Sequence, residues 1–172
     1  LQVPEATAAA ASCRETAASR LLRSHSAAEY GGRLARAVRA VPGSSVRTFA
    51  QCAEILDTVD RANVGMLLDT WHFCAGGSQL EELSALRGDR LFMVHVSDCP
   101  ARAPFTAQRA ESYWPGEGDA PLEELLRSVR ATGYDGPCSV EVMDPNVLAL
   151  PAEEAIRRAA ETMKPLLARV ER

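Results

Sequence analysis

The chain has 172 residues, of which 47% are hydrophobic and 24% charged, and its net charge is −4. This composition is typical of a globular protein, and the length suits one domain with a sizeable core. The acidic balance and the lack of a basic stripe argue against a nucleic-acid-binding surface. No apolar run approaches the length of a membrane span, and the first residues do not have the pattern of a signal peptide.

The five cysteines are dispersed along the chain, and none forms a Cys-x-x-Cys pair. An odd, scattered set is typical of reduced thiols in a cytoplasmic protein rather than of a disulfide framework or a zinc knuckle. We therefore expect a cytoplasmic protein in which these residues serve as small apolar side chains.

The elements divide the chain into two parts. Residues 1–32 are Ala-rich and favour a helix, with no convincing strand, whereas the chain from residue 33 alternates apolar runs with amphipathic stretches. Strands are predicted over 33–41, 64–69, 90–98 and 138–143, and helices over 48–62, 78–88, 121–133 and 152–172. Within these helices, Ser78 is expected to be an N-cap, Gly88 a C-terminal stop, and Pro165 a kink or a break.

This order predicts an α/β protein in which residues 33–172 form about four parallel β/α units. Such units occur in (β/α)8 barrels and in open doubly wound sheets. No nucleotide-binding glycine motif follows a strand, and four units are half of an eightfold barrel, whose usual length is about 250 residues. Half a barrel has open sheet edges, so a partner chain or a homo-oligomer is expected to cover them.

Polar residues stand near the ends of three successive strands: Asp69, His95 and Glu141. The carboxyl ends of parallel strands meet at one edge, which hosts the active site in barrels and open sheets. Taken singly, a buried histidine is more often a hydrogen-bonded core residue, and an aspartate that closes a strand is often a helix N-cap. Corresponding positions on three strands favour a shared site for a divalent cation, for which Mn, Mg, Zn or Co suits these ligand types.

Several motifs also carry a resemblance to a family. D-T-W-H-F follows one strand, H-V-S-D ends the next, P-G-E-G-D precedes a helix, and G-Y-D-G-P-x-S-V-E-V lies near the end. In this order, over residues 27–172, they resemble the xylose isomerase-like TIM barrels, and most closely the sugar phosphate isomerase/epimerase group. The resemblance implies a (β/α)8 barrel, of which this chain matches strands five to eight.

The resemblance also implies roles for particular residues. Family members hold one divalent ion with Glu, Asp, His and Glu from four strand ends; here Asp69, His95 and Glu141 match the last three. Glu141 would also act in catalysis as an acid or base, and His72 would bind substrate or assist catalysis. Glu117, in the P-G-E-G-D loop, would contact substrate; the alternative is that this loop is only a turn before the next helix.

Two departures from the family pattern stand out. The stretch RLARAVRAVPGSSVRT places Ala37 where the first glutamate ligand is expected. Neither Arg36 nor Arg39 can replace that glutamate, because a guanidinium group does not ligate metals. The arginine often found before P-G-E-G would fall near Tyr113, and Arg109 is a displaced substitute for binding substrate.

Two functions from different classes therefore stay open. The first is a metal-dependent isomerase or epimerase of carbohydrate metabolism, acting on a small sugar, sugar phosphate or polyol by proton transfer next to a carbonyl. This proton transfer forms an enolate. A dehydratase of the inosose or 3-dehydroshikimate type would use the same enolate and lose a β-hydroxyl group from it. The second is a truncated, catalytically impaired half-barrel remnant. Phosphodiesterase chemistry of the endonuclease IV type is disfavoured, because three histidines are too few for a trinuclear site.

Overall fold

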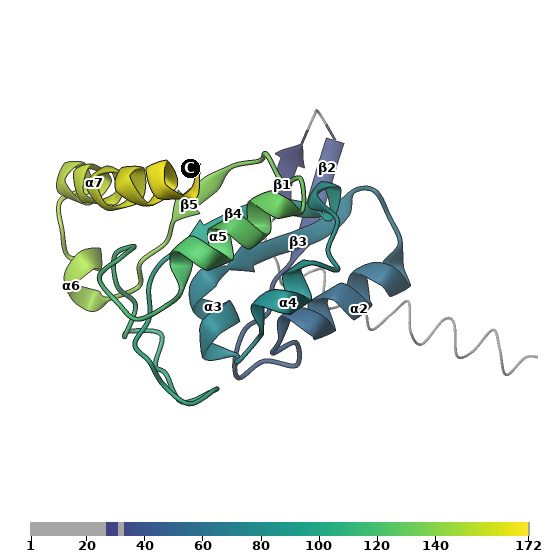
Figure 1. The fold of residues 1–172 in the computed structure, drawn as a ribbon, viewed down its shortest axis with the longest axis horizontal. Coiled ribbons are helices and arrows are strands. Elements are labelled where there is room, and N and C mark those ends of the chain that lie inside the picture. The colour runs from purple at the N-terminus through teal and green to yellow at the C-terminus, as the bar shows by residue number, and fades with distance from the viewer. Residues whose placement is uncertain (1–26, 31–32, 172) are drawn as a thin grey trace, which may run out of the picture.

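The computed structural model describes residues 27–30 and 33–171, and it is an α/β structure (Figure 1). Its strands are β1 (Ala27–Tyr30), β2 (Arg33–Val38), β3 (Val64–Asp69), β4 (Leu91–Val96) and β5 (Cys138–Val140). Its helices are α2 (Phe49–Val59), α3 (Thr70–Ala75), α4 (Leu80–Leu83), α5 (Leu122–Ala131), α6 (Pro145–Leu148) and α7 (Ala152–Val170), with a 3₁₀ turn, η1, at Gly88–Arg90. Within the described ranges, no helix combines the length and apolar character that crossing a membrane requires.

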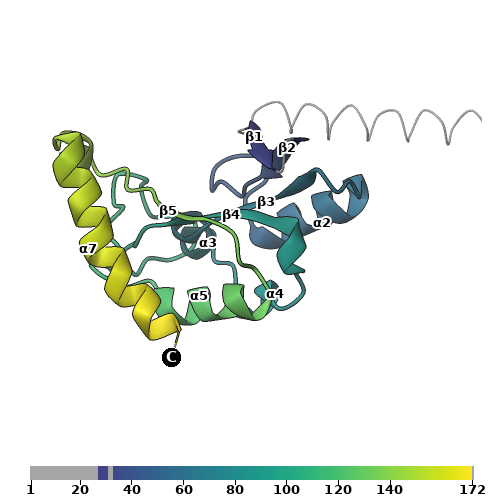
Figure 2. The same cartoon turned by 90° about the horizontal axis from the view of Figure 1, so that it is seen from above.

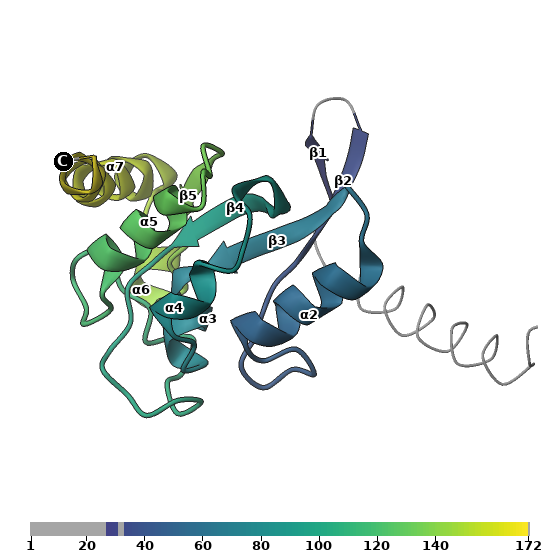
Figure 3. The ribbon, with the colours of Figure 1, turned by 45° about the vertical axis from the view of Figure 1, so that its right-hand side comes forward.

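The strands form one sheet in the order β1-β2-β3-β4-β5. Strands β2 to β5 are parallel, as predicted, and β1 pairs with β2 in the antiparallel direction. Figure 3 shows β3 and β4 side by side with their carboxyl ends at the same edge. A parallel sheet with helical connections confirms the expected α/β class.

Alternate residues of each strand point to opposite faces of the sheet. Val38, Met66, Leu68, Val94 and Val96 all belong to one buried core, which also contains apolar side chains of α2, α5 and α7. Figure 2 shows these helices along one side of the curved sheet. We call the other side the open face, and the alternation assigns Ala37, Leu67, Asp69, Met93, His95 and Glu141 to it.

Two strand predictions need correction. The strand over 138–143 is not buried: β5 ends at Val140, and Cys138 and Ser139 are exposed, because β5 is the last strand of the described sheet. Strand β1 lies inside the segment 1–32, where no strand was expected. Glycines occupy positions 31 and 32, and Gly-Gly between strands favours a short hairpin. The helix predicted for the rest of that segment lies outside the described residues.

Two helix predictions also differ from the structure. The helix expected over 78–88 is only the single turn α4, and Ser78 does not cap it; its hydroxyl accepts a hydrogen bond from the backbone N–H of Phe49 at 3.1 Å. Helix α7 is continuous through Pro165, so the break expected as one of two outcomes is wrong, while the kink stays a prediction. Met163 and Leu166 on either side of the proline are buried in the core, and this packing outweighs the lost backbone hydrogen bond.

Candidate active site

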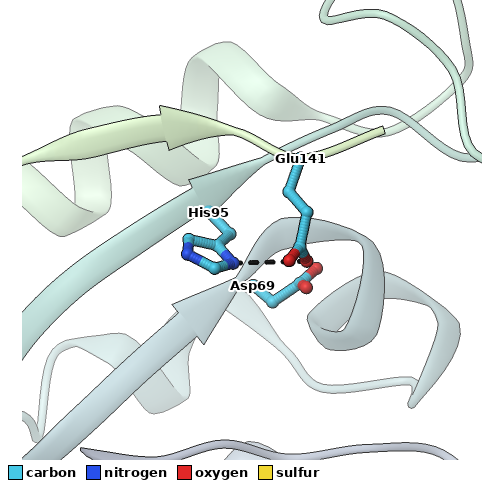
Figure 4. Close-up of side chains that lie close together, drawn as sticks. All are labelled: Asp69, His95 and Glu141. Carbon is cyan, nitrogen blue, oxygen red and sulfur yellow. Dashed lines mark ion pairs between the residues drawn. The ribbon is translucent and has the colours of Figure 1, made fainter. Parts of the chain in front are cut away.

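The sheet register brings the three strand-end residues together. Asp69 is the last residue of β3 and lies opposite His95 of β4, which in turn lies opposite Ser139, two residues before Glu141. Ligand atoms of Asp69, His95 and Glu141 all lie within 4.8 Å of one another. Figure 4 shows the three side chains converging from successive strands. Their common location agrees with the sequence pattern, while their role as metal ligands stays a prediction.

Asp69 has two structural roles that the sequence left as alternatives. Its Oδ1 accepts a hydrogen bond from the backbone N–H of His72 at 3.1 Å, so Asp69 is the N-cap of α3. Its Oδ2 faces the guanidinium groups of Arg39 and Arg109. Burial raises the pKa of Asp69, although the charge of Arg109 and the hydrogen bond from His72 act in the opposite direction.

Two guanidinium groups lie against the carboxylates. Arg39 Nη1 is 3.4 Å from Asp69 Oδ2 and 3.2 Å from Glu141 Oε2. Arg109 Nη2 is 3.4 Å from Asp69 Oδ2 and 2.9 Å from Glu141 Oε2. Arg109 was a predicted site residue, but Arg39 was not. The available signal was the alternation of β2, which puts the residue two positions after Ala37 on the same open face.

Both histidines of this site have a ring nitrogen with no hydrogen-bond partner among the described residues. His95 Nδ1 lies 3.2 Å from Glu141 Oε2, an ion-pair distance without hydrogen-bond geometry. His72 Nε2 lies 3.6 Å from Asp69 Oδ2, and its buried Nδ1 is unpaired. Burial, followed by the charges of Arg109 and Arg39, lowers the pKa of His72 to about 3, so this ring is neutral at pH 7.

The donor set fits a divalent cation. His95 Nδ1 is buried and has no hydrogen-bond partner among the described residues, and it lies beside the carboxylates of Asp69 and Glu141. An imidazole nitrogen and two carboxylates are the ligand types that Zn and related ions take. Burial opposes ionisation of Glu141, but the charges of His95, Arg39 and Arg109 outweigh it and lower the pKa of this carboxyl. A cation at these oxygens has to displace the guanidinium groups that now contact them.

The P-G-E-G-D loop is organised by Asp98, a residue whose role the sequence did not reveal. The buried Asp98 carboxylate accepts hydrogen bonds from the backbone N–H groups of Cys99, Gly116 and Ala120, each at 2.9 Å. In the same loop, Glu117 Oε1 accepts a 2.6 Å hydrogen bond from Arg158 of α7. The expected contact of Glu117 with substrate stays a prediction.

The chain is similar to several known proteins. The family profile described as xylose isomerase-like TIM barrel matches residues 3–166. Inosose isomerase of Bacillus subtilis (strain 168) is 36% identical over 133 residues, which cover 77% of this chain and 48% of that protein. A 3-dehydroshikimate dehydratase of Pseudomonas aeruginosa is 31% identical over 111 residues, which cover 63% of this chain and 18% of that protein.

A crystal structure of the IolI protein with a bound zinc atom superimposes with a TM-score of 0.75 at 34% identity. The match covers 78% of this chain and 49% of that one. The chain therefore spans about half the length of the curated inosose isomerases that it matches. Since the family profile covers most of the sequence, the chain belongs to the xylose isomerase-like TIM barrel family.

Proposed function

We propose that this chain carries the metal-binding half of an active site that isomerises or epimerises a small sugar or polyol next to a carbonyl. The convergence of Asp69, His95 and Glu141 within 4.8 Å is the observation that carries this proposal. Similarity to inosose isomerases and to a protein crystallised with zinc supports the same chemistry. Asp69, His95 and Glu141 would hold one divalent ion, and Zn, Mn, Mg and Co all remain candidates.

The bound cation would supply Lewis-acid polarisation of a substrate carbonyl, which acidifies the neighbouring C–H bond. Glu141 would accept the proton from that carbon and return it to the former carbonyl carbon, while the hydroxyl proton moves to the other oxygen, so that the carbonyl shifts by one position. The neighbouring positive charges lower the pKa of Glu141 and so favour the ionised form that a base needs. His72, neutral and buried one turn beyond Asp69, has its Nε2 3.6 Å from Asp69 Oδ2 and would orient a substrate hydroxyl from that side of the ring. Removal of the C–H proton gives an enolate, and an enolate that loses a β-hydroxyl group gives a dehydration product. A dehydratase is therefore the second choice.

A catalytically impaired protein is the candidate from a different class. Two observations favour it: Ala37 stands where the family has a glutamate ligand, and Arg39 and Arg109 already neutralise the remaining carboxylates. For the impaired protein we also propose that a second copy or a partner chain covers the sheet edge. Analytical ultracentrifugation, which measures the oligomeric state, tests this.

Metal analysis and hydrogen exchange separate the two candidates. The chain is purified with Zn²⁺ or Mn²⁺, and bound metal is measured for the wild type and for Asp69→Asn, Glu141→Gln and the exposed control Glu124→Gln. We expect one ion per chain in the wild type and the control, and a loss of at least tenfold in affinity in the other two. Unchanged metal content in both site variants would sink the metal proposal.

Activity is followed by NMR in D₂O, as deuterium incorporation next to the carbonyl of a neutral compound, a keto-inositol, and of an anionic one, a ketose phosphate. Metal-dependent exchange that is lost in Glu141→Gln supports the enzyme. Stoichiometric metal without exchange supports the impaired protein.

A further inference from the structure

The two carboxylates of the candidate centre already face two guanidinium groups before any cation binds. Asp69 and Glu141 provide two carboxylates, and Arg39 and Arg109 provide two guanidinium groups at 2.9–3.4 Å from them. A divalent cation held by the two carboxylates neutralises them and leaves two guanidinium charges without counter-ions. Such charges are costly in a partly buried site unless an anion pairs with them.

The two arginines are held at the site by more than the carboxylates. Arg109 lies over the ring of Trp71, with its Cζ 5.0 Å from the ring centroid, so it keeps a cation–π partner when its carboxylate contacts are lost. Arg109 Nη1 is buried and has no hydrogen-bond partner among the described residues. Arg39 is the first residue after β2, so the backbone of that strand fixes the position from which the Arg39 side chain extends. The side chains are 29% and 26% exposed, so a ligand can reach them.

Because residue 37 is an alanine, a coordination position of the metal is left for a substrate oxygen. On the open face, Ala37 precedes Arg39 by two residues, and its methyl group offers no ligand atom. A centre with three protein ligands keeps coordination positions for substrate oxygens. An anionic oxygen at such a position would lie on the side of the centre from which Arg39 approaches.

We propose that Arg39 and Arg109 form an oxyanion subsite, and that the substrate is therefore an acid whose carboxylate or phosphate group pairs with them. Arg39 is the residue that determines this specificity. The proposal rests on the metal-dependent function above and deepens it, because it selects sugar acids, keto acids and sugar phosphates over neutral polyols. Guanidinium groups suit this role because their fork of N–H donors matches both carboxylate and phosphate oxygens.

Three probes that share one carbon skeleton test the subsite by calorimetry on the zinc-loaded chain: glycerate, glycerol 3-phosphate and glycerol. The anionic probes are expected to bind at least tenfold more tightly than glycerol. Arg39→Met and Arg109→Met should each weaken the anionic probes by roughly ten- to a hundredfold, the range for a charge-assisted hydrogen bond. Arg61→Met, at an exposed arginine in the loop before β3, is the matched control and should bind like the wild type.

A metal-free arm separates this proposal from the metal site. In Asp69→Asn/Glu141→Gln the guanidinium groups lose their carboxylate partners, while an asparagine side chain still caps α3. We expect this variant to bind glycerol 3-phosphate without metal, and the added Arg39→Met substitution to abolish that binding. If the wild type takes up no metal but this variant binds the anion, the proposed function fails and the subsite stands.

Three results overturn the subsite. They are equal affinity for glycerol and the anions, equal loss in Arg61→Met and Arg39→Met, and no anion binding to the metal-free double variant. A preference between glycerate and glycerol 3-phosphate identifies the anionic group, and either preference supports the subsite.

Discussion

Asp69 contacts His72 through both of its carboxylate oxygens: Oδ1 accepts the backbone N–H at 3.1 Å, and Oδ2 lies 3.6 Å from the side-chain Nε2. The first contact begins α3 directly after β3, and the second keeps the imidazole beside the carboxylate cluster. The same residue therefore sets the course of the backbone and the position of a site side chain. Changes at either residue are expected to affect stability and binding together.

Replacing His72 should change how stability depends on pH. An unfolded histidine has a pKa of about 6.5, whereas burial and the charges of Arg109 and Arg39 lower the pKa of His72 to about 3 in the folded chain. Between these values the unfolded chain binds a proton that the folded chain does not, so folding stability falls as the pH falls. The slope from this group is at most about 1.4 kcal/mol per pH unit.

Urea denaturation of metal-free protein between pH 6.5 and 5 measures this slope in the wild type and in His72→Gln. The variant should lose less stability over the interval. The raised pKa of Asp69 acts in the opposite direction in both proteins, so the difference between their slopes reports His72. Parallel stability curves for the two proteins would contradict a neutral, buried His72.

Thr70→Val should destabilise the junction of α3 and β4. The fully buried Thr70 hydroxyl donates a 2.6 Å hydrogen bond to the carbonyl of Ser97 and accepts one from its N–H at 3.0 Å. Valine has nearly the same shape but leaves both groups unpaired, which costs about 2–3 kcal/mol of unfolding free energy. Thr70→Ser keeps the hydroxyl and should lose about 1 kcal/mol or less. Equal losses in the two variants, measured in urea, would show that these hydrogen bonds are unimportant.

Asp98 and Gly118 should behave as a coupled pair. A Cβ on Gly118 would lie 2.5 Å from Asp98 Oδ1, so Gly118→Ala forces the carboxylate away from its three N–H donors. Asp98→Ala should cost about 3 kcal/mol, because these donors lose a charged acceptor. Gly118→Ala should cost less in the Asp98→Ala background than alone, as a double-mutant cycle by chemical denaturation would show. Additive costs would mean that the two residues act independently.

Ala37→Glu should strengthen metal binding. Ala37 lies opposite Gly65 in the sheet and shares the open face with Arg39 and the carboxylate cluster. An added carboxylate offers a fourth ligand and extra negative charge, for which we expect roughly a tenfold gain in zinc affinity, or about 1.4 kcal/mol. Titration against a zinc chelator measures the change. Ser45→Glu adds the same charge at an exposed position. An equal gain in zinc affinity there would count against a vacant ligand position at residue 37.

Local patterns predicted most of the sheet. The apolar run VGMLLD is strand β3 with the predicted bounds, and the helices over 48–62 and 121–133 are α2 and α5 with ends shifted by a few residues. Predictions were poorer where long-range contacts decide. α4 is one turn because Ser78 hydrogen-bonds to Phe49 instead of capping a longer helix, and α7 runs through Pro165 because its neighbours pack in the core.

For the site, the sequence by itself determined which side chains stand near the ends of β3, β4 and β5, because strand alternation and polarity are local properties. It also placed Ala37 at the position where a glutamate was expected. Only the tertiary structure decided that Arg39 and Arg109 both reach the carboxylates, from residues 30 and 40 positions away from Asp69. Such contacts depend on sheet register and on the path of the loop after β4, which no local pattern encodes.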